Sequence, residues 1–136
     1  MNMLEEGPEL KLDFRKLEKA VAGSPGILPV AIQNADTNEV ILVAYTNDLA
    51  FRKSIETRTL VLWSTSRHEL WEKGKTSGET FDLLEVYVNC EQNSLLYRVR
   101  PKRGAICHTK NQAGRPRNCF YRRLNPATMK LENLNP

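Results

Sequence analysis

The sequence predicts a small, mainly β protein of the α+β class with two short helices. Five short apolar runs are separated by segments rich in Gly, Pro, Asn and Asp, a pattern typical of strands joined by turns. Two other segments carry apolar residues at helical spacing. The 136 residues are 40% apolar and 26% charged, as in ordinary globular proteins, and this length suffices for one hydrophobic core.

The N-terminal part predicts one helix after a flexible start. Residues 1–12 are polar, and we expect them to be loosely ordered. The helix follows because Asp13 can accept hydrogen bonds from its first amides and Gly23 can end its last turn. Its apolar face is formed by Phe14, Leu17, Ala20 and Val21. Residues 24–26 read Ser-Pro-Gly and predict a turn.

The next two apolar runs predict a β-hairpin followed by the second helix. Strands are expected over 27–33 and 40–45, because the residues between them, 35–38, have the composition of a turn. Asn47 or Thr46 can cap a helix that runs to about Thr57.

The second half of the chain predicts three further strands and much loop. A strand is expected over 60–64, and then a polar loop over 66–80 that is rich in Gly, Ser and Thr. Strands over 81–90 and 95–99 are expected to pair through the turn between them. Beyond Pro101 the sequence predicts loop until 119–121. We therefore divide the chain into a flexible segment 1–12, one domain 13–124 and a tail 125–136.

The N-terminal residues and the length of the apolar runs indicate where in the cell we expect the protein. The N-terminus is acidic and lacks the apolar run of a signal peptide. The longest apolar run, 40–45, is far too short to cross a membrane. We therefore expect a cytoplasmic protein without a membrane partner. In a reducing cytoplasm, cysteines serve as metal ligands or thiols more often than as disulfides.

The three cysteines are the most informative residues. They are Cys90, Cys107 and Cys119, and His108 directly follows the second. Three thiolates suit Zn²⁺ and leave a fourth position open to water, whereas structural zinc sites are usually closed by four protein ligands. The long spacings place the ligands on separate elements or separate subunits. The pattern predicts catalytic zinc and hydrolysis; the alternative is that the cysteines are small buried side chains without a metal.

Positive charge is concentrated near two of these cysteines. The net charge is +4, and nine Lys or Arg residues but no Asp or Glu lie between Arg98 and Arg123. Such a stretch attracts phosphate groups, on a nucleotide or on a nucleic acid. The alternative is a solvated basic surface. The overlap with two cysteines favours an anionic ligand near the metal.

Several sequence motifs occur in a fixed order around the cysteines. They read Trp-Ser-Thr-Ser-Arg at 63–67, Leu-Trp-Glu-Lys-Gly-Lys-Thr-Ser-Gly at 70–78, Cys-His-Thr at 107–109 and Cys-Phe-Tyr-Arg at 119–122. The upstream string 27–37 through 44–45 belongs to the same pattern. Together they resemble the phosphoribosyl-AMP cyclohydrolase family, with a likeness that spans about residues 12–123. The domain 13–124 would then be cyclohydrolase-like.

The resemblance implies a compact homodimer with a folded, barrel-like mixed sheet and active sites shared at the subunit interface. Cys90 would bind zinc together with Cys107 and Cys119 of the partner subunit. The implied reaction, in histidine biosynthesis, opens the adenine ring of phosphoribosyl-AMP by hydrolysis between N1 and C6. The implied partner is therefore a small nucleotide substrate.

The resemblance also implies roles for other residues. His108 is the candidate for proton transfer, because imidazole titrates near neutral pH; the alternative is a packed imidazole. The substrate's two phosphates need cations and backbone donors. The residues that match family positions for this purpose are Arg67, Lys73, Gly74, Thr76, Ser77 and Gly78.

Two segments depart from the family pattern. The family has Asp-Cys-Asp-x-Asp around the first cysteine, which holds Mg²⁺, whereas Asn89, Glu91 and Asn93 stand here. These side chains can still converge on an extended strand. One carboxylate and two amides suit Mg²⁺ poorly, so we expect low affinity unless another carboxylate helps. The segment 110–118 is also longer than usual, and its two arginines could reshape the entrance for the substrate.

Three other functions compete with a phosphoribosyl-AMP cyclohydrolase. One is a zinc hydrolase of a different purine or pyrimidine nucleotide. Another is a basic nucleic-acid-binding module with structural zinc, which would need a fourth ligand such as His108. The third is a paralogue that keeps the dimer but has lost turnover together with the aspartates.

Overall fold

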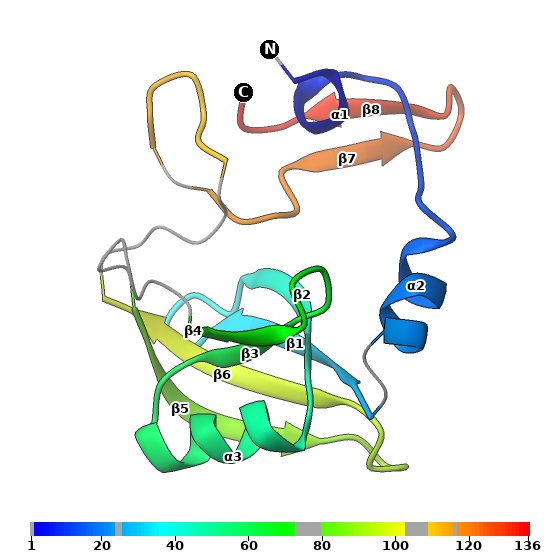
Figure 1. Ribbon diagram of the computed structural model, residues 1–136. Coiled ribbons are helices and arrows are strands. Elements are labelled where there is room, and N and C mark those ends of the chain that lie inside the picture. The colour runs from blue at the N-terminus through cyan, green and yellow to red at the C-terminus, as the bar shows by residue number, and fades with distance from the viewer. Residues whose placement is uncertain (1, 24–25, 73–79, 103–108, 116) are drawn as a thin grey trace.

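The computed structural model describes residues 2–23, 26–72, 80–102, 109–115 and 117–136. Within these residues the chain forms eight strands and three helices, so the predicted mainly β class is confirmed (Figure 1). The predicted sites at Lys73, Gly74, Thr76, Ser77, Gly78, Cys107 and His108 lie outside the described residues.

A mixed sheet of four strands forms the centre of the molecule. Its strands are β1 (Leu28–Asn34), β2 (Val40–Thr46), β5 (Phe81–Val88) and β6 (Leu95–Pro101). The order across the sheet is β2-β1-β6-β5. The β1–β2 and β5–β6 pairs are antiparallel hairpins, as predicted, whereas β1 and β6 run parallel. This parallel pairing joins the two hairpins into one sheet.

Helix α3 (Asp48–Thr57) follows β2. The chain then forms a short hairpin of strands β3 (Val61–Ser64) and β4 (Glu69–Glu72). Asn47 caps the helix as predicted, with its Oδ1 accepting a hydrogen bond from Ala50 N at 2.9 Å. The turn between the two strands of the hairpin lies close to the C-terminal end of helix α2 (Lys16–Gly23). A Cβ at Gly23 would lie 2.3 Å from Cε1 of His68, so a larger residue there would displace the exposed imidazole.

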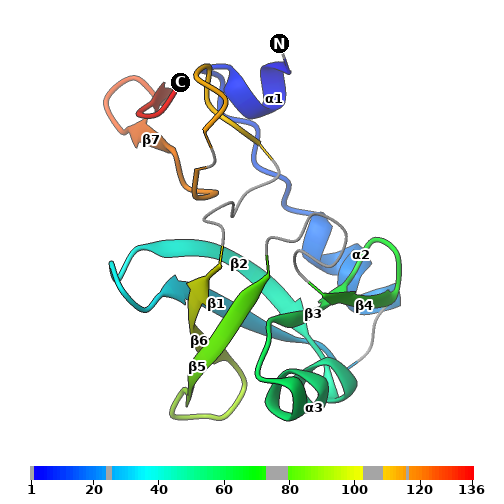
Figure 2. The ribbon, with the colours of Figure 1, turned by 90° about the vertical axis from the view of Figure 1, so that its left-hand side faces the viewer.

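The core lies between the sheet and these covering elements, as the turned view in Figure 2 shows. Tyr97 and Val99 of β6 are fully buried, because inward-facing residues alternate along the strand. The other buried members of the cluster are Val30, Ile32, Ile41, Leu42, Leu60, Leu62, Phe81 and Leu83. Among the described residues the strands do not close into a barrel, although a bridge between Thr59 and Asp82 brings the start of the β3–β4 hairpin to β5.

Helix α2 (Lys16–Gly23) is exposed over most of its apolar face. The sequence predicted that Phe14, Leu17, Ala20 and Val21 form this face. Ala20 is buried, but Phe14 is 86% exposed, and Leu17 and Val21 are each 52% exposed. The helix therefore covers little of the core of its own chain.

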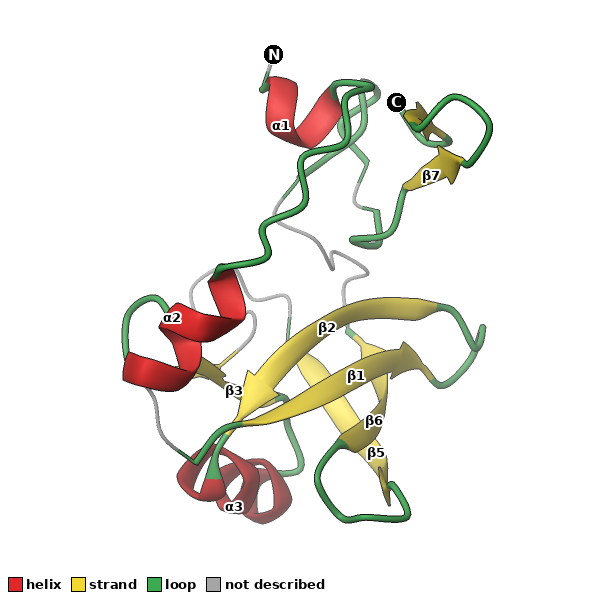
Figure 3. Ribbon diagram, turned by 90° about the vertical axis from the view of Figure 1, so that its right-hand side faces the viewer, coloured by secondary structure: helices red, strands yellow, loops and turns green. Residues whose placement is uncertain are grey.

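The two ends of the chain form elements that the sequence analysis missed. Helix α1 (Met3–Glu6) and the strand pair β7 (Arg122–Asn125) and β8 (Lys130–Asn133) lie together, away from the four-stranded sheet (Figure 3). A bridge joins Glu9 to Lys130. These elements are short and polar, so hydrophobic periodicity does not reveal them. The prediction of only two helices was therefore wrong.

The loop predicted over 66–80 also contains a strand. Residues 69–72 form β4, because a turn with His68 at φ 54° folds the chain back onto β3. Trp71 packs against the core cluster. The burial of this single large side chain outweighs the polar composition of its neighbours.

Candidate functional site

Cys90 lies in the exposed turn that joins β5 to β6, and the side chains around it converge, although in a turn and not on the extended strand that the sequence led us to expect. Asn89 Nδ2 donates to Asn93 Oδ1 at 2.6 Å, and Asn93 Nδ2 donates to Glu91 Oε2 at 3.2 Å. The Oδ1 of Asn89 accepts from the backbone N–H groups of Asn93 and Ser94 at 2.8 and 2.9 Å. The turn is therefore held by its own hydrogen bonds.

These contacts do not fit a magnesium ion. Mg²⁺ needs oxygen ligands that point into one octahedral shell, and it prefers carboxylates. Here both amide oxygens already accept hydrogen bonds, and amide N–H groups occupy the space between the three side chains. Glu91 is the single carboxylate of the cluster. The three side chains are thus joined by hydrogen bonds and do not form a shell of free oxygen ligands.

Cys119 lies on the segment that leads into β7, and its backbone is fixed to the central sheet. Its N–H donates to Ile41 O, at the start of β2, at 2.9 Å. The neighbouring Asn118 Nδ2 donates to Glu39 Oε2 at 2.7 Å. The side chain of Cys119 is exposed. The thiol is thus presented to solvent by a well-anchored backbone.

The two described cysteines lie at opposite ends of the sheet. Cys90 precedes Leu95, which pairs with Val30, whereas Cys119 contacts Ile41 beside the far end of β1. From Leu95 to Val99 alone β6 spans about 13 Å, whereas two sulfur ligands of one Zn²⁺ lie about 4 Å apart. Figure 1 shows the β5–β6 turn at the lower end of the sheet and the segment leading into β7 above it. One chain therefore does not bring Cys90 and Cys119 to the same ion.

The chemistry of the donors nevertheless fits zinc. Both described thiols are exposed, as ligands shared between subunits must be. Thiolates are preferred zinc ligands, and three of them leave one position open. Among the described residues no group of three His, Cys, Asp or Glu side chains could hold a metal within one chain. Within the described part of one chain, Cys90 and Cys119 therefore have no third ligand that would complete a metal site.

A cavity of about 420 Å³ is lined in part by Val88, Gln92 and Leu95, at the β5–β6 turn that carries Cys90. This volume is in the range of small-molecule sites. Its lining combines apolar side chains with a few polar ones from the start of α3 and the β5–β6 turn: Gly26, Leu28, Thr46, Asn47, Asp48, Phe51, Val88, Gln92 and Leu95. The sequence analysis did not identify it, because its walls come from three distant segments.

Arg67 is the one predicted phosphate-binding residue among the described residues. It lies in the β3–β4 turn, where its Nε is 3.5 Å from Glu69 Oε1. Both side chains are more than half exposed, so this ion pair is weak and a phosphate could displace it.

Much of the basic stretch between Arg98 and Arg123 is paired with carboxylates from elsewhere in the chain. Five of its cations form ion pairs: Arg98 with Glu85, Arg100 with Asp36, Lys102 with Asp82, Arg117 with Glu6, and Arg123 with Glu132. These contacts hold the pKa values of Glu6, Asp36 and Glu132 below their usual range, and the pKa of Glu85 is lowered first by the hydrogen bond from Tyr87 and then by Arg98. Arg98 and Arg117, whose side chains are largely buried, are therefore not available to phosphate, whereas the exposed pairs are as weak as that of Arg67.

Comparison with known proteins agrees with the motifs. The family model described as phosphoribosyl-AMP cyclohydrolase matches residues 42–121, which contain all three cysteines. The chain belongs to the phosphoribosyl-AMP cyclohydrolase family.

Individual relatives cover most of the chain. A phosphoribosyl-AMP cyclohydrolase of Hyphomonas neptunium is 39% identical over 88% of this chain and 81% of its own length. One from Archaeoglobus fulgidus is 41% identical over 73% of this chain and 86% of its own. A bifunctional histidine biosynthesis protein of Thermus thermophilus is 41% identical over 73% of this chain and 44% of its own.

Proposed function

We propose that this protein is a phosphoribosyl-AMP cyclohydrolase of histidine biosynthesis, which opens the adenine ring between N1 and C6 by hydrolysis. The observation that carries this proposal is the family match over residues 42–121, with relatives of that name along most of the chain. The described structure contributes a sheet that presents Cys90 and Cys119 on its surface.

We further propose that the active unit is a homodimer with zinc sites shared between subunits. Cys90 would bind the ion together with Cys107 and Cys119 of the partner subunit. The separation of Cys90 from Cys119 within one chain supports this arrangement. The exposed apolar face of α2, with Phe14, Leu17 and Val21, supplies surface that a second copy could bury.

Bound zinc with one open position supplies a nucleophilic water at neutral pH. The protein's own groups then have two tasks. His108 would take up and release protons, so that N1 receives a proton when its bond to C6 breaks and becomes part of a neutral formamidine group. The cavity at the β5–β6 turn would hold the purine, with Phe51 and Leu95 against the ring faces and Asn47 at its edge.

The substrate's phosphates would bind the segment that follows β3. Arg67 contributes a guanidinium that can form two parallel hydrogen bonds with a phosphate. Lys73, Thr76 and Ser77 would add a cation and two hydroxyls, and Gly74 and Gly78 would let backbone N–H groups come close. No step is assigned to Mg²⁺, since the cluster around Asn89 does not fit that ion.

The ion pairs of the basic stretch between Arg98 and Arg123 help to judge the alternative function, a nucleic-acid-binding module. Such a protein needs a row of unpaired cations along the phosphate backbone. Here five cations of the basic stretch pair with carboxylates of the same chain. The ion pairs therefore favour a small nucleotide, which needs only a few cations.

The experiment that tests the proposed function measures metal content and turnover together. Purified protein is analysed for zinc per subunit, and phosphoribosyl-AMP is followed by its absorbance with and without added Mg²⁺. We expect bound zinc, and turnover that does not depend on Mg²⁺. Protein that binds zinc but leaves phosphoribosyl-AMP intact would contradict the substrate assignment, and protein without zinc would contradict the site.

A further inference from the structure

Arg117 is a buried cation in the segment that joins two of the candidate zinc ligands. It lies eight residues after Thr109 and two residues before Cys119. The sequence analysis expected it at the substrate entrance, but only 1% of its side chain is exposed. A buried charge is costly unless it is paired and fully hydrogen-bonded. Its surroundings must therefore be built around the guanidinium.

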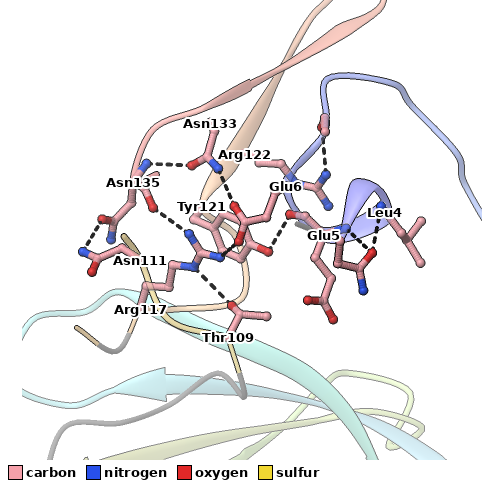
Figure 4. A network of polar contacts seen from close by, with 12 residues as sticks. Leu4, Glu5, Glu6, Thr109, Asn111, Arg117, Tyr121, Arg122, Asn133 and Asn135 are labelled. Atoms are coloured by element: carbon pink, nitrogen blue, oxygen red, sulfur yellow. Dashed lines mark hydrogen bonds and ion pairs between the residues drawn. The ribbon is translucent and has the colours of Figure 1, made fainter. Parts of the chain in front are cut away.

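Each edge of the guanidinium has a partner from a different part of the chain, as Figure 4 shows. Nε donates to Thr109 Oγ1 at 3.1 Å, and Nη1 donates to Asn135 O at 2.7 Å. Nη2 forms an ion pair with the carboxylate of Glu6 in α1. The planar group also lies 3.6 Å from the ring centroid of Tyr121. Both ends of the chain thus converge on one side chain.

The contact with Thr109 matters most for the candidate zinc site. Thr109 is buried and directly follows His108, which itself follows Cys107. The hydrogen bond between Arg117 and Thr109 therefore ties the end of the Cys107–His108 segment to the start of the Cys119 segment. It closes the loop 110–118 at its base.

The loop itself is compact, which explains how this chain accommodates its extra length. Asn111 Oδ1 accepts a hydrogen bond from Arg115 N at 2.8 Å, and Asn111 N donates to Arg115 O at 3.0 Å. Asn111 Nδ2 donates to Asn135 Oδ1 at 3.0 Å, next to the contact that Arg117 makes with the same residue. Asn111 is thus fixed to the C-terminal residues that follow β8.

Cys119 is fixed on its other side as well. Tyr121 is buried and donates its hydroxyl hydrogen to Glu5 O at 2.8 Å. Arg117 and Tyr121 stack on each other and flank Cys119 at two residues on either side. The backbone of Cys119 is consequently held between two anchored side chains and β2.

From these contacts we propose that Arg117 is a positioning residue that sets the spacing between Cys107–His108 and Cys119. The inference rests on the proposed zinc site. Bringing two ligands together from separate segments costs loop entropy, and a closed loop lowers the cost at the moment of metal binding. Arg117 would act on the metal site through Thr109 and through the backbone that carries Cys119.

The test compares zinc affinities, measured by competition with a chromogenic chelator, in full-length variants. Arg117→Met removes all the hydrogen bonds that the guanidinium donates. Arg117→Lys keeps the positive charge but loses the planar arrangement of N–H donors. Thr109→Val removes the hydroxyl that accepts one of these bonds, with little change in side-chain shape. Arg115→Met is the matched control, because Arg115 is an exposed arginine of the same loop. Circular dichroism verifies that each variant is folded at the assay temperature.

We expect Arg117→Met to weaken zinc binding by roughly 10–100-fold, as is typical of residues that orient metal ligands. Arg117→Lys should recover part of this loss, and Arg115→Met should leave the affinity unchanged. Thr109→Val should weaken binding in the same direction, and the double variant should be no weaker than Arg117→Met alone, since both changes break one hydrogen bond. Cobalt-substituted protein should show altered thiolate absorption bands in the same variants.

Other results would overturn the inference. If Thr109→Val and a folded Arg117 variant bind zinc as tightly as the unmodified protein, Arg117 has no positioning role. Additive effects of the two substitutions would contradict action through their shared hydrogen bond. If the unmodified protein binds no zinc, the proposed function fails together with this inference, whereas unaffected variants of a zinc-binding protein contradict the inference alone.

Discussion

At the scale of single residues, Cys107 and His108 have different proposed roles: Cys107 holds the metal, and His108 moves protons. Cys107→Ala should remove zinc and activity together, because it deletes a ligand. His108→Ala should keep the zinc and slow turnover by roughly 100-fold or more, the usual contribution of a general acid or base. Zinc analysis and initial rates on the same samples distinguish the two. Loss of zinc from His108→Ala would make His108 a ligand instead.

The turn around Cys90 allows a second test at this scale. Asn89→Asp together with Asn93→Asp restores two carboxylates beside Glu91 and replaces amide donors with acceptors. We expect Mg²⁺ binding, measured by calorimetry, to become detectable in this variant and to be absent in the unmodified protein. Asn38→Asp serves as a control in another turn. Equal Mg²⁺ affinity before and after the change would refute this interpretation of the cluster.

Glu6 links residue chemistry to stability. The hydrogen bond from Arg117 lowers the pKa of Glu6 below its ordinary value of 4.5, so the folded state favours the ionised carboxylate. The stabilisation is therefore complete above the pKa of the unfolded chain and is lost as the pH falls through the lower pKa of the folded state.

Urea unfolding between pH 3 and 7 measures this effect against Glu6→Gln, which cannot titrate. The difference in free energy of unfolding between the two proteins should be constant above about pH 5 and should shrink at lower pH. A difference that does not change with pH would show that the ion pair adds nothing. The comparison cancels the other carboxylates with lowered pKa values, Asp36, Glu85 and Glu132.

At the scale of elements, α3 is joined to the hairpin of β3 and β4 by one buried hydroxyl. Ser54 Oγ donates to Val61 O at 2.8 Å and accepts from Val61 N at 3.0 Å. Ser54→Ala leaves both backbone groups buried without a partner and should cost about 1–3 kcal/mol of stability. Ser66→Ala, on an exposed serine, should change stability little. Denaturant unfolding of both variants tests this, and equal midpoints would contradict it.

The elements also show what sequence could predict. The two hairpins of the sheet and the cap at Asn47 were predicted correctly, because turn residues and alternating apolar residues encode them locally. The parallel pairing of β1 with β6 was not predicted, since it joins residues about 65 positions apart. Helix α1 and the β7–β8 pair were missed because polar contacts such as Glu6 with Arg117 hold them.

The candidate site was predictable to a similar extent. The cysteines were singled out from the residues themselves, whereas Asn89, Glu91 and Asn93 were singled out through the family resemblance; the structure shows that these three side chains converge. The burial of Arg117 was not, because its partners come from both ends of the chain. The pairing of the basic stretch with distant carboxylates was missed for the same reason. In each case a correct prediction would have required contacts between residues that lie far apart in the sequence.

At the scale of the whole molecule, the described residues place Cys90 and Cys119 at opposite ends of one sheet. The exposed face of α2 leaves apolar surface uncovered. No helix among the described residues has the length and apolar character to cross a membrane. The proposed homodimer joins these observations, because it covers apolar surface and brings cysteines of two chains to one ion.

The most direct test of this central claim mixes two inactive variants, Cys90→Ala and Cys119→Ala, under conditions where subunits exchange. Each variant alone should bind no zinc tightly and should not turn over phosphoribosyl-AMP. In an equal mixture, random pairing gives half heterodimers, each with one complete site, so zinc and activity should return to about one quarter of the unmodified level. No recovery, with exchange verified by mass spectrometry, would contradict a zinc site shared between subunits.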